Sequence, residues 1–424
     1  MPGGSWKGEA RDLGEGALSL WILGVVLVLV AVRRIGPVSF AIWQVMAAGA
    51  LAVLLTGQIS PKEALRAVNA DVMVFLFGMF VLGEALCSSG LMALLSVRLF
   101  GGAKNVGQLV GILLFSMGLF SALLMNDTVA IIGTPLVLFL ARRCSIPPRP
   151  LLLALAFAVT IGSVASPIGN PQNLLIALDS GGNPFVTFFR YLNLPTVICL
   201  GLAWLVLRLL NPGLFQRPLR APAPEPLEDP RLARLCVVSL VLVVLLVGLK
   251  VALFFAGPGL DFPLSAIAVS GCLPILLFSP GRFRILKDLD WATLAFFAAM
   301  FVLMAAAWES APFQALAGQA RNRLDTVSEI LAAGVLVSQV VSNVPFVALA
   351  LPILHGAGVK AAMALAAGST LAGNLFILGA ASNVIIIQNA EKRGETLTFG
   401  EFAKAGIPLT AACAGVYGVF LALA

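Results

Sequence analysis

Residues 114–143 read LFSMGLFSALLMNDTVAIIGTPLVLFLARR, an apolar run that Asn126-Asp127-Thr128 interrupts and that a pair of arginines ends. A similar interruption, Ser342-Asn343, divides the apolar stretch at about 325–355. Irregular backbone at membrane depth is tolerated only where it lines a cavity or is buried in protein. Each interruption therefore predicts a re-entrant hairpin whose tip faces the interior of the protein.

The composition places these hairpins in a membrane. Hydrophobic residues make up 60% of the 424 residues and charged residues only 11%, whereas a soluble domain carries about 25% charged residues. A helix needs about 20 apolar residues to cross the hydrocarbon, so the chain has room for about ten spans beside the two hairpins. We therefore predict an all-α polytopic membrane protein.

Several function classes are disfavoured by the composition. The net charge of +7 is expected from Lys and Arg that face the cytoplasm, and no basic cluster on a soluble face suggests a nucleic-acid partner. His355 is the only histidine and the six cysteines are far apart, so we expect no metal site and no disulfide framework. Since neither a phosphate-binding loop nor a nucleophile–base constellation occurs, we predict that the protein is not an enzyme and needs no cofactor.

The two halves of the chain share three sequence features in the same order, which indicates an internal repeat. Each half contains a Met-Phe-Val-Leu tetrapeptide shortly after an aspartate, then an asparagine nine residues before a proline, then a glycine four residues before an asparagine. The features are Asp71 with 79–82 and Asp290 with 300–303, Asn126 with Pro135 and Asn343 with Pro352, and Gly169 with Asn173 and Gly379 with Asn383.

The repeat divides the chain into two predicted units. The proline-rich segment 211–234, with charges of both signs, is typical of a linker. The first predicted repeat covers 1–210, with a hairpin at about 105–142 and a broken helix at about 150–180. The second covers 235–424, with a hairpin at about 325–355 and a broken helix at about 359–390.

The distribution of charge predicts that the repeats are inverted. If each hairpin re-enters and each broken helix spans, each half crosses the membrane an odd number of times. Two thirds of the 27 Lys and Arg residues then fall on one side. The positive-inside rule makes that side cytoplasmic, with the linker on it and both termini outside. Inverted repeats with discontinuous helices are a recurring transporter design.

The polar residues at the hairpin tips and helix breaks form the candidate site. Half-helix N-termini present free N–H groups, unwound segments present carbonyls, and Asn and Gln side chains both donate and accept hydrogen bonds. Such a set suits a small polar solute; the alternative is that these side chains join helices to one another by hydrogen bonds. The candidate solute-binding residues are Asn126, Thr128, Asn170, Gln172, Asn173, Ser342, Asn343, Ser382 and Asn383.

Asp127 has no acidic counterpart in the second half, where its register partner is Val344. An ionisable residue at mid-membrane is by default a functional hypothesis. We expect Asp127 to carry a coupling proton, with Na⁺ as the alternative coupling ion. The other interpretation is a structural carboxylate at a helix N-terminus.

At these residues the sequence resembles the ion transporter superfamily. The resemblance rests on 125–128 (Met-Asn-Asp-Thr), 166–173 (Ser-Pro-Ile-Gly-Asn-Pro-Gln-Asn) and 342–345 (Ser-Asn-Val-Pro), and it extends over about 20–424. The superfamily includes arsenite and antimonite efflux permeases, sodium/proton antiporters, citrate–metal and dicarboxylate carriers, and the melanosomal P protein. Its dicarboxylate branch carries Ser-Asn-Thr at both tips, whereas the Asn-Asp-Thr tip of this chain resembles the arsenite permease branch.

The resemblance to arsenite permeases implies a function and an assembly. It implies proton-coupled efflux of the neutral trihydroxides As(OH)₃ and Sb(OH)₃ across a prokaryotic inner membrane, by a transport domain that moves like an elevator against a scaffold. It also implies a homodimer and, in some members, a soluble ATPase partner. The alternatives are a Na⁺- or H⁺-coupled carrier of anions or dicarboxylates, a cation/proton antiporter and an uncoupled channel.

Overall fold

The described part of the protein is helical apart from short connections and one pair of two-residue strands. The computed structural model describes residues 18–29, 34–35, 38–39, 42–91, 100–180, 182–219, 229–256, 262–321, 324–391 and 393–424. The strands β1 (Arg34–Ile35) and β2 (Val38–Ser39) pair antiparallel. Residues 1–17 of the predicted first repeat and 220–228 of the predicted linker lie outside the described residues.

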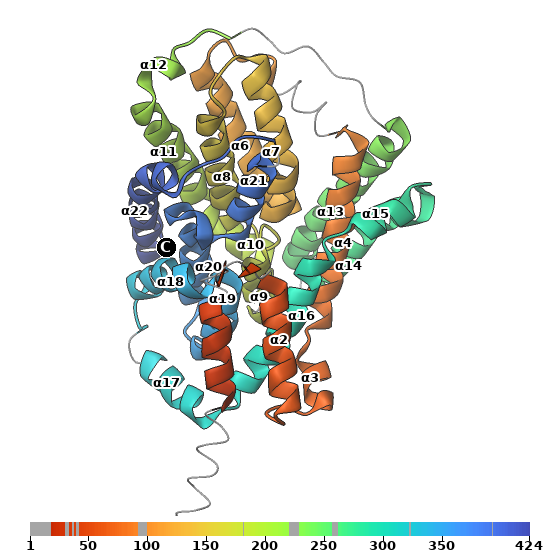
Figure 1. Cartoon of the computed structure of the whole chain (residues 1–424), viewed down its shortest axis with the longest axis vertical. Helices are drawn as coiled ribbons and strands as arrows, with labels where there is room; N and C mark the ends of the chain where they lie inside the picture. The colour runs from red at the N-terminus through yellow and green to blue at the C-terminus, as the bar shows by residue number, and fades with distance from the viewer. Residues whose placement is uncertain are drawn as a thin grey trace, which may run out of the picture.

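One set of helices, which we call the flanking group, lies partly beside and partly below the body of the molecule (Figure 1). In it α4 packs against α13 and α14, and α16 packs against α2. Its members are the helix 18–29, α2 (Ile42–Leu55), α3 (Pro61–Ala67), α4 (Ala70–Ser89), α13 (Pro230–Ala256), α14 (Leu264–Phe278), α15 (Arg282–Asp288) and α16 (Trp291–Trp308).

A second set, the hairpin group, forms the body of the molecule. Its members from the first half are α6 (Val106–Leu124), α7 (Asn126–Arg143), α8 (Pro148–Val164), α9 (Pro171–Asp179), α10 (Pro184–Phe188), η1 (Phe189–Asn193), α11 (Leu194–Leu210) and α12 (Pro212–Phe215). Those from the second half are α18 (Val327–Val341), α19 (Asn343–Ile353), α20 (Val359–Leu375), η2 (Ile377–Gly379), α21 (Ala381–Glu391) and α22 (Phe399–Leu423). The amphipathic helix α17 (Ala311–Arg321) connects α16 to this group.

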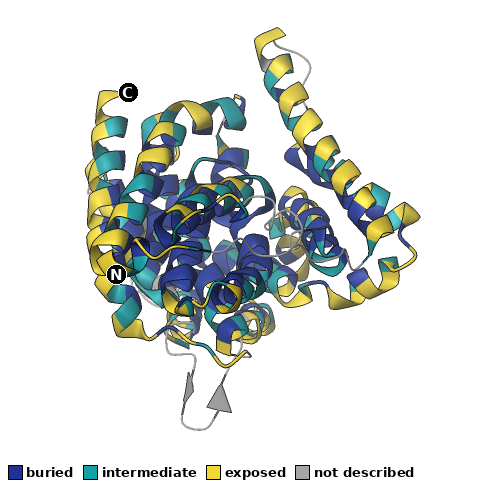
Figure 2. Cartoon of the chain, turned by 90° about the horizontal axis from the view of Figure 1, so that it is seen from above, coloured by how far each residue is buried: buried dark blue, intermediate teal, exposed yellow. Residues whose placement is uncertain are grey.

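The outer surface of these helices is apolar. Exposed large apolar side chains occur on α2, α11, α14 and α22, among them Leu55, Leu209, Phe278 and Leu423. Figure 2 shows buried residues gathered in the interior and exposed residues on the outer helices. Leaving a Leu or Phe side chain in water forgoes about 1.5–3 kcal/mol, so this surface suits lipid rather than water.

Six helices in the described part of the chain are long and apolar enough to cross a membrane. They are α4, α6, the continuous run from α10 to α11 (Pro184–Leu210), α13, α16 and α22. Six shorter apolar helices accompany them, including Pro148–Val164, Val327–Gln339 and Asn343–Ile353. Since a break shortens each of these three, helix length alone does not count the spans, and the total of about ten estimated from helix length stays a prediction.

Two hairpins turn sharply inside the body of the molecule. The first hairpin, α6 and α7, turns at Met125 (φ 71°, ψ 143°), and the second, α18 and α19, turns at Ser342 (φ 74°, ψ 156°). Non-glycine residues rarely adopt this conformation, which costs about 1–3 kcal/mol and clusters at functional sites. In Figure 1 the first hairpin lies above the second, and their turns meet near the middle of the molecule.

Two helices are interrupted beside these turns. The first broken helix consists of α8 and α9, separated by 165–170, and the second consists of α20 and α21, separated by 376–380. Each packs against a hairpin, α8 on α6 and α20 on α18. Gly162 permits the first contact, because a Cβ there would lie 2.2 Å from the carbonyl oxygen of Gly118. Gly368 permits the second, because its Cβ would lie 2.6 Å from Leu331 O.

The upper ends of four helices are joined by polar contacts. An ion pair links Arg149, at the start of α8, to Glu401, at the start of α22, with Nη1 and Oε1 2.5 Å apart. Nearby, Arg142 Nη2 at the end of α7 donates to the carbonyl oxygen of Arg393, which follows α21 (3.3 Å). These arginines belong to the side predicted to be cytoplasmic, and the opening of the first hairpin toward that side stays a prediction.

Candidate solute-binding site

A cavity of about 320 Å³ lies where the two hairpin turns face the flanking group. The turns contribute residues on α7 and α19, the broken helices contribute α9 and α21, and the flanking group contributes α2 and α16. The polar residues that line it are Asn126, Asp127, Gln172, Asp290, Thr293, Ser342, Asn343 and Gln388, and Trp43, Phe296 and Phe297 are among its apolar lining. The cavity therefore collects side chains from both halves of the chain.

Five of the ten predicted site residues reach this cavity: Asn126, Asp127, Gln172, Ser342 and Asn343. The backbone N–H of Asn126 donates to the carbonyl of Gly169 (2.8 Å), which joins the first hairpin to the first broken helix. Within the hairpin, Asn126 Oδ1 accepts from the N–H of Asp127 (2.9 Å). The bond to Gly169 holds the turn against the break, so the two interruptions form one structure.

Two oxygens at the turns are buried without a hydrogen-bond partner among the described residues. They are Asp127 Oδ1 and Asn343 Oδ1, on side chains that are 8% and 5% exposed. Leaving a buried polar atom unpaired costs about 1–3 kcal/mol, and more for a charged group. Since both residues line the cavity, this is the arrangement expected of groups that bind a polar solute or a proton.

The other predicted residues lie around the breaks rather than in the cavity. Asn170 Oδ1 caps α9 by accepting from the N–H of Asn173 (2.8 Å), and Asn170 Nδ2 donates to Ser163 Oγ (3.0 Å). The amide of Asn173 donates to the carbonyls that end α8, and that of Asn383 donates to Gly373 O at 2.5 Å. These amides supply partners for the backbone groups that a broken helix leaves unpaired, and direct contact of Asn170, Asn173 and Asn383 with a solute remains a prediction.

Thr128 and Ser382 also lie outside the cavity. Thr128 packs against α4, where a Cβ on Gly83 would come within 2.6 Å of its methyl group. Ser382 lies at the start of α21, and its hydroxyl is buried without a hydrogen-bond partner in the described part of the chain. Neither position contradicts a role in transport, but neither side chain lines the central cavity.

The cavity lining includes four residues with hydrogen-bonding side chains that the sequence did not nominate as site residues: Trp43, Asp290, Thr293 and Gln388. Asp290 caps α16, since its Oδ1 accepts from the N–H of Thr293 (3.0 Å) and its Oδ2 from the hydroxyl of Thr293 (2.6 Å). The internal repeat pairs Asp290 with Asp71. This pairing is the sequence feature that could have nominated Asp290 as a site residue. Asp71 instead accepts from Ser265 Oγ (2.7 Å) between α4 and α14.

The ionisable side chains that line the cavity are acidic. Asp127 and Asp290 are its charged residues, and its described lining includes no Lys, Arg or His. The N-termini of α7 and α19 point partial positive charge toward the same space, as helix dipoles do. A polyanion would meet two carboxylates without a basic partner, so the cavity is better suited to a neutral or cationic solute.

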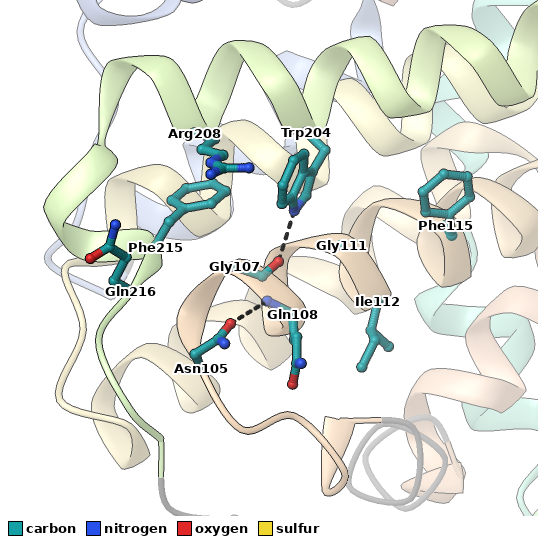
Figure 3. Close-up of a pocket in the computed structure, with 10 residues that line it drawn as sticks. All are labelled: Asn105, Gly107, Gln108, Gly111, Ile112, Phe115, Trp204, Arg208, Phe215 and Gln216. Atoms are coloured by element: carbon teal, nitrogen blue, oxygen red, sulfur yellow. Dashed lines mark hydrogen bonds between the residues drawn. The ribbon is translucent and has the colours of Figure 1, made fainter.

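A larger hollow, of about 800 Å³, lies elsewhere, at the outer ends of α6 and α11 (Figure 3). Its wall is held by Trp204 Nε1, which donates to Gly107 O (2.8 Å), and the guanidinium of Arg208 stacks 5.2 Å from the Trp204 ring. None of the predicted site residues lines this hollow. We place the site in the central cavity, because the strained turns and the unpaired oxygens converge there.

Comparison with known proteins identifies the family. Residues 25–362 match the CitMHS family, described as citrate transporters. The 46 kDa membrane protein of Mycobacterium leprae is 30% identical over 382 residues, covering 84% of this chain and 86% of the relative. An uncharacterised transporter of Mycobacterium tuberculosis is also 30% identical, over 84% of this chain and 86% of its own length. The P protein of Mus musculus is 24% identical over 93% of this chain and 58% of the relative.

Solved structures show the same fold at low sequence identity. The YdaH transporter of Alcanivorax borkumensis superposes with a TM-score of 0.58 at 16% identity, covering 96% of this chain and 98% of that one. MtrF of Neisseria gonorrhoeae, described as one of a class of antimetabolite efflux pumps, gives 0.56 at 16% identity over 96% and 94%. The prediction of a polytopic helical membrane transporter is confirmed, and the specific assignment to the arsenite permeases is not. The chain belongs to the CitMHS family of citrate transporters.

Proposed function

We propose that this protein is a secondary active transporter that exports the neutral trihydroxides of arsenic and antimony in exchange for protons, across the inner membrane of a prokaryote. The observation that carries the proposal is the chemistry of the central cavity. Amide and hydroxyl groups from both hairpin turns meet there beside two carboxylates, and the described lining has no basic side chain.

The cavity lining matches the hydrogen-bonding pattern of a trihydroxide. Each hydroxyl of As(OH)₃ donates and accepts, and the amides of Asn126, Gln172 and Asn343 do both as well. The unpaired oxygen of Asn343 would accept from such a hydroxyl. A neutral solute also avoids the repulsion that citrate would meet at Asp127 and Asp290.

Asp127 is the group that we assign to proton coupling. Its side chain is buried at the first hairpin turn, lines the cavity and has one oxygen without a hydrogen-bond partner among the described residues. Protonation would remove its charge before the hairpin crosses the hydrocarbon, where a charged carboxylate is expensive. Solute exit and proton entry would then alternate on the same element.

We further propose that the two halves are inverted repeats and that the hairpin group moves like an elevator against the flanking group. Three observations support this. The turns at Met125 and Ser342 share one rare backbone conformation, Asn173 and Asn383 cap the first parts of the two broken helices in the same way, and the hairpins approach the middle from opposite directions in Figure 1. A homodimer and a soluble ATPase partner remain expectations from the resemblance.

A second candidate is a carrier that moves a carboxylate anion together with a cation. It is favoured by the family description as citrate transporters. Asp127 and Asp290 could face the cation of such a complex, so that the anion would not meet bare carboxylates. Na⁺ in place of H⁺ as the coupling ion belongs to this candidate.

The test is transport by the purified full-length protein in proteoliposomes. We expect arsenite accumulation under an imposed pH gradient, no accumulation when a Na⁺ gradient replaces it, and no uptake of citrate with or without Mg²⁺. Asp127→Asn keeps the size of the side chain and should abolish coupling to the pH gradient. Citrate uptake that depends on Mg²⁺ or Na⁺, without arsenite transport, would replace this proposal by the second candidate.

A further inference from the structure

Asp127 and Asp290 also line a second, smaller cavity. This cavity measures about 60 Å³ and lies between α4 of the flanking group, the start of α7 and the segment from α15 to α16. It is lined by Glu84, Asp127, Asp288 and Asp290, together with Cys87 and Thr128 among others. A polar cavity of this size is large enough to hold water.

The carboxylates in this cavity form a series that leads from the interior to the surface. Asp127 is 8% exposed, Glu84 on α4 is half-buried, and the side chain of Asp288 is 48% exposed. Asp290 is close enough to Asp127 for their charges to repel. Glu84 is likewise repelled by Asp288, whereas the Arg284 guanidinium attracts it. Arg284 Nε, at the outer end, pairs with Asp288 Oδ2 at 3.7 Å.

The spacing of these acids does not fit a metal site. Among the described residues, no three His, Cys, Asp or Glu side chains gather closely enough to hold a metal ion. Glu84 Oε1 instead accepts from Ser88 Oγ (3.1 Å), a bond that fixes its position on α4. Acids that are spaced apart and joined by room for water suit the stepwise movement of a proton rather than the binding of a cation.

We propose that Glu84 and Asp288, with Asp290 at the boundary with the solute cavity, line a proton path through which Asp127 exchanges its proton with the cytoplasmic side. The proton on the Asp127 carboxyl passes by way of water to the Glu84 carboxylate and from there to Asp288 and the solution, so each carboxylate is restored as the next is protonated. The inference rests on the proposed proton coupling. It assigns the solute and the proton to the two cavities that Asp127 lines.

The path forms because the hairpin turn and α4 approach each other closely. Gly83 is the residue of α4 that faces Thr128, and a Cβ there would come within 2.6 Å of the Thr128 methyl group and 2.9 Å of its hydroxyl. Asp127 belongs to the hairpin group, whereas Glu84, Asp288 and Asp290 belong to the flanking group or its connections. Any movement of the first hairpin against α4 would therefore separate the proton from its path.

The test compares proton movement with solute exchange in proteoliposomes of the full-length protein that contain a pH-sensitive dye. In the Glu84→Gln and Asp288→Asn variants, arsenite-driven proton movement should fall about a hundredfold, the lower range for loss of a proton-transfer group. Arsenite exchange between compartments of equal pH should fall much less. Glu84→Asp should restore part of the proton movement, and Glu309→Gln, exposed beyond the opposite end of α16, should leave both rates unchanged.

The outcomes separate the two proposals. If the wild-type protein moves no protons with arsenite, the proposed function fails and the path fails with it. If the wild-type protein couples and Glu84→Gln moves protons at the wild-type rate, only the path is refuted. Proportional loss of proton movement and exchange in Glu84→Gln would also refute it, since that pattern indicates damage to the fold.

A measurement on the wild-type protein tests the path even if the variants do not fold. A hydrophobic carbodiimide adds to protonated carboxyl groups in apolar surroundings, and mass spectrometry locates the adduct. We expect adducts on Asp127 and Glu84 and none on Glu309. Adducts that exclude both Asp127 and Glu84 would overturn the path.

Discussion

Replacing Asn173 with alanine should destabilise the protein rather than change which solute it binds. Asn173 Nδ2 donates to the carbonyl oxygens of Ser163 (3.0 Å), Val164 (3.3 Å) and Ser166 (3.0 Å), and the side chain is fully buried. An amide nitrogen carries two protons, so these contacts amount to about two full bonds of about 1 kcal/mol each, and unpaired buried carbonyls add about 1–3 kcal/mol. We expect a loss of about 3 kcal/mol in the free energy of unfolding.

The assay is thermal unfolding of the detergent-solubilised protein, followed by solute binding to the fraction that remains folded. Asn383→Ala removes one contact, to Gly373 O at 2.5 Å, and should lose about 1 kcal/mol. Asn211→Ala, which removes a half-buried bond to Leu207 O (3.1 Å) at the end of α11, is the control and should lose least. An Asn173→Ala protein with wild-type stability and weakened solute binding would refute this reasoning and return Asn173 to the binding site.

Two further predictions concern packing and pH. Gly162→Val should prevent accumulation of folded protein, because its Cβ would lie 2.2 Å from Gly118 O. Gly201→Val is the control and should be tolerated, because the added Cβ meets nothing within 4 Å from neighbouring elements. Equal yields of the two variants in membranes would contradict this prediction. The pKa of Glu63, in the loop helix α3, is lowered because the Ser60 hydroxyl and then the Ser60 backbone N–H donate to its carboxylate. This stabilisation is present at neutral pH and is lost as pH falls through the lowered pKa. Glu63→Gln should therefore lower the melting temperature at pH 7 but not at a pH below that pKa. A difference in melting temperature between wild type and variant that persists below that pKa would contradict the assignment.

The breaks in the helices could be predicted because their signal is local. Asn126-Asp127-Thr128 and Ser342-Asn343 interrupt apolar runs, and the chain turns within one residue of each, at Met125 and at Ser342. Polar residues in hydrocarbon require buried partners, so such a pattern limits the backbone to a turn or break that faces protein. Together with the apolar composition, this requirement predicts the helical class and the position of the turns.

The direction of each side chain at the breaks could not be predicted in the same way. Asn170, Asn173 and Asn383 satisfy the same sequence pattern as Asn126 and Asn343, but their amides bond to backbone and hydroxyl groups near the ends of α8 and α20. An asparagine amide serves a helix end and a solute equally well. Whether the amide bonds to a helix end or to a solute depends on the distance between the two half-helices. That distance cannot be derived from the sequence.

The sequence by itself determined the solvent, the helical class, the positions of the turns and the acid at the first turn, since composition and local polarity decide each of these. Only the tertiary structure decided which residues line the cavity. Asp290, Thr293, Gln388 and Trp43 enter it because α2, α16 and α21 pack around the two turns, and Glu84 and Asp288 meet Asp127 because Gly83 lets α4 approach the first hairpin. These residues are far apart in the chain, and a site made by long-range packing appears only when the helices that carry it are placed side by side.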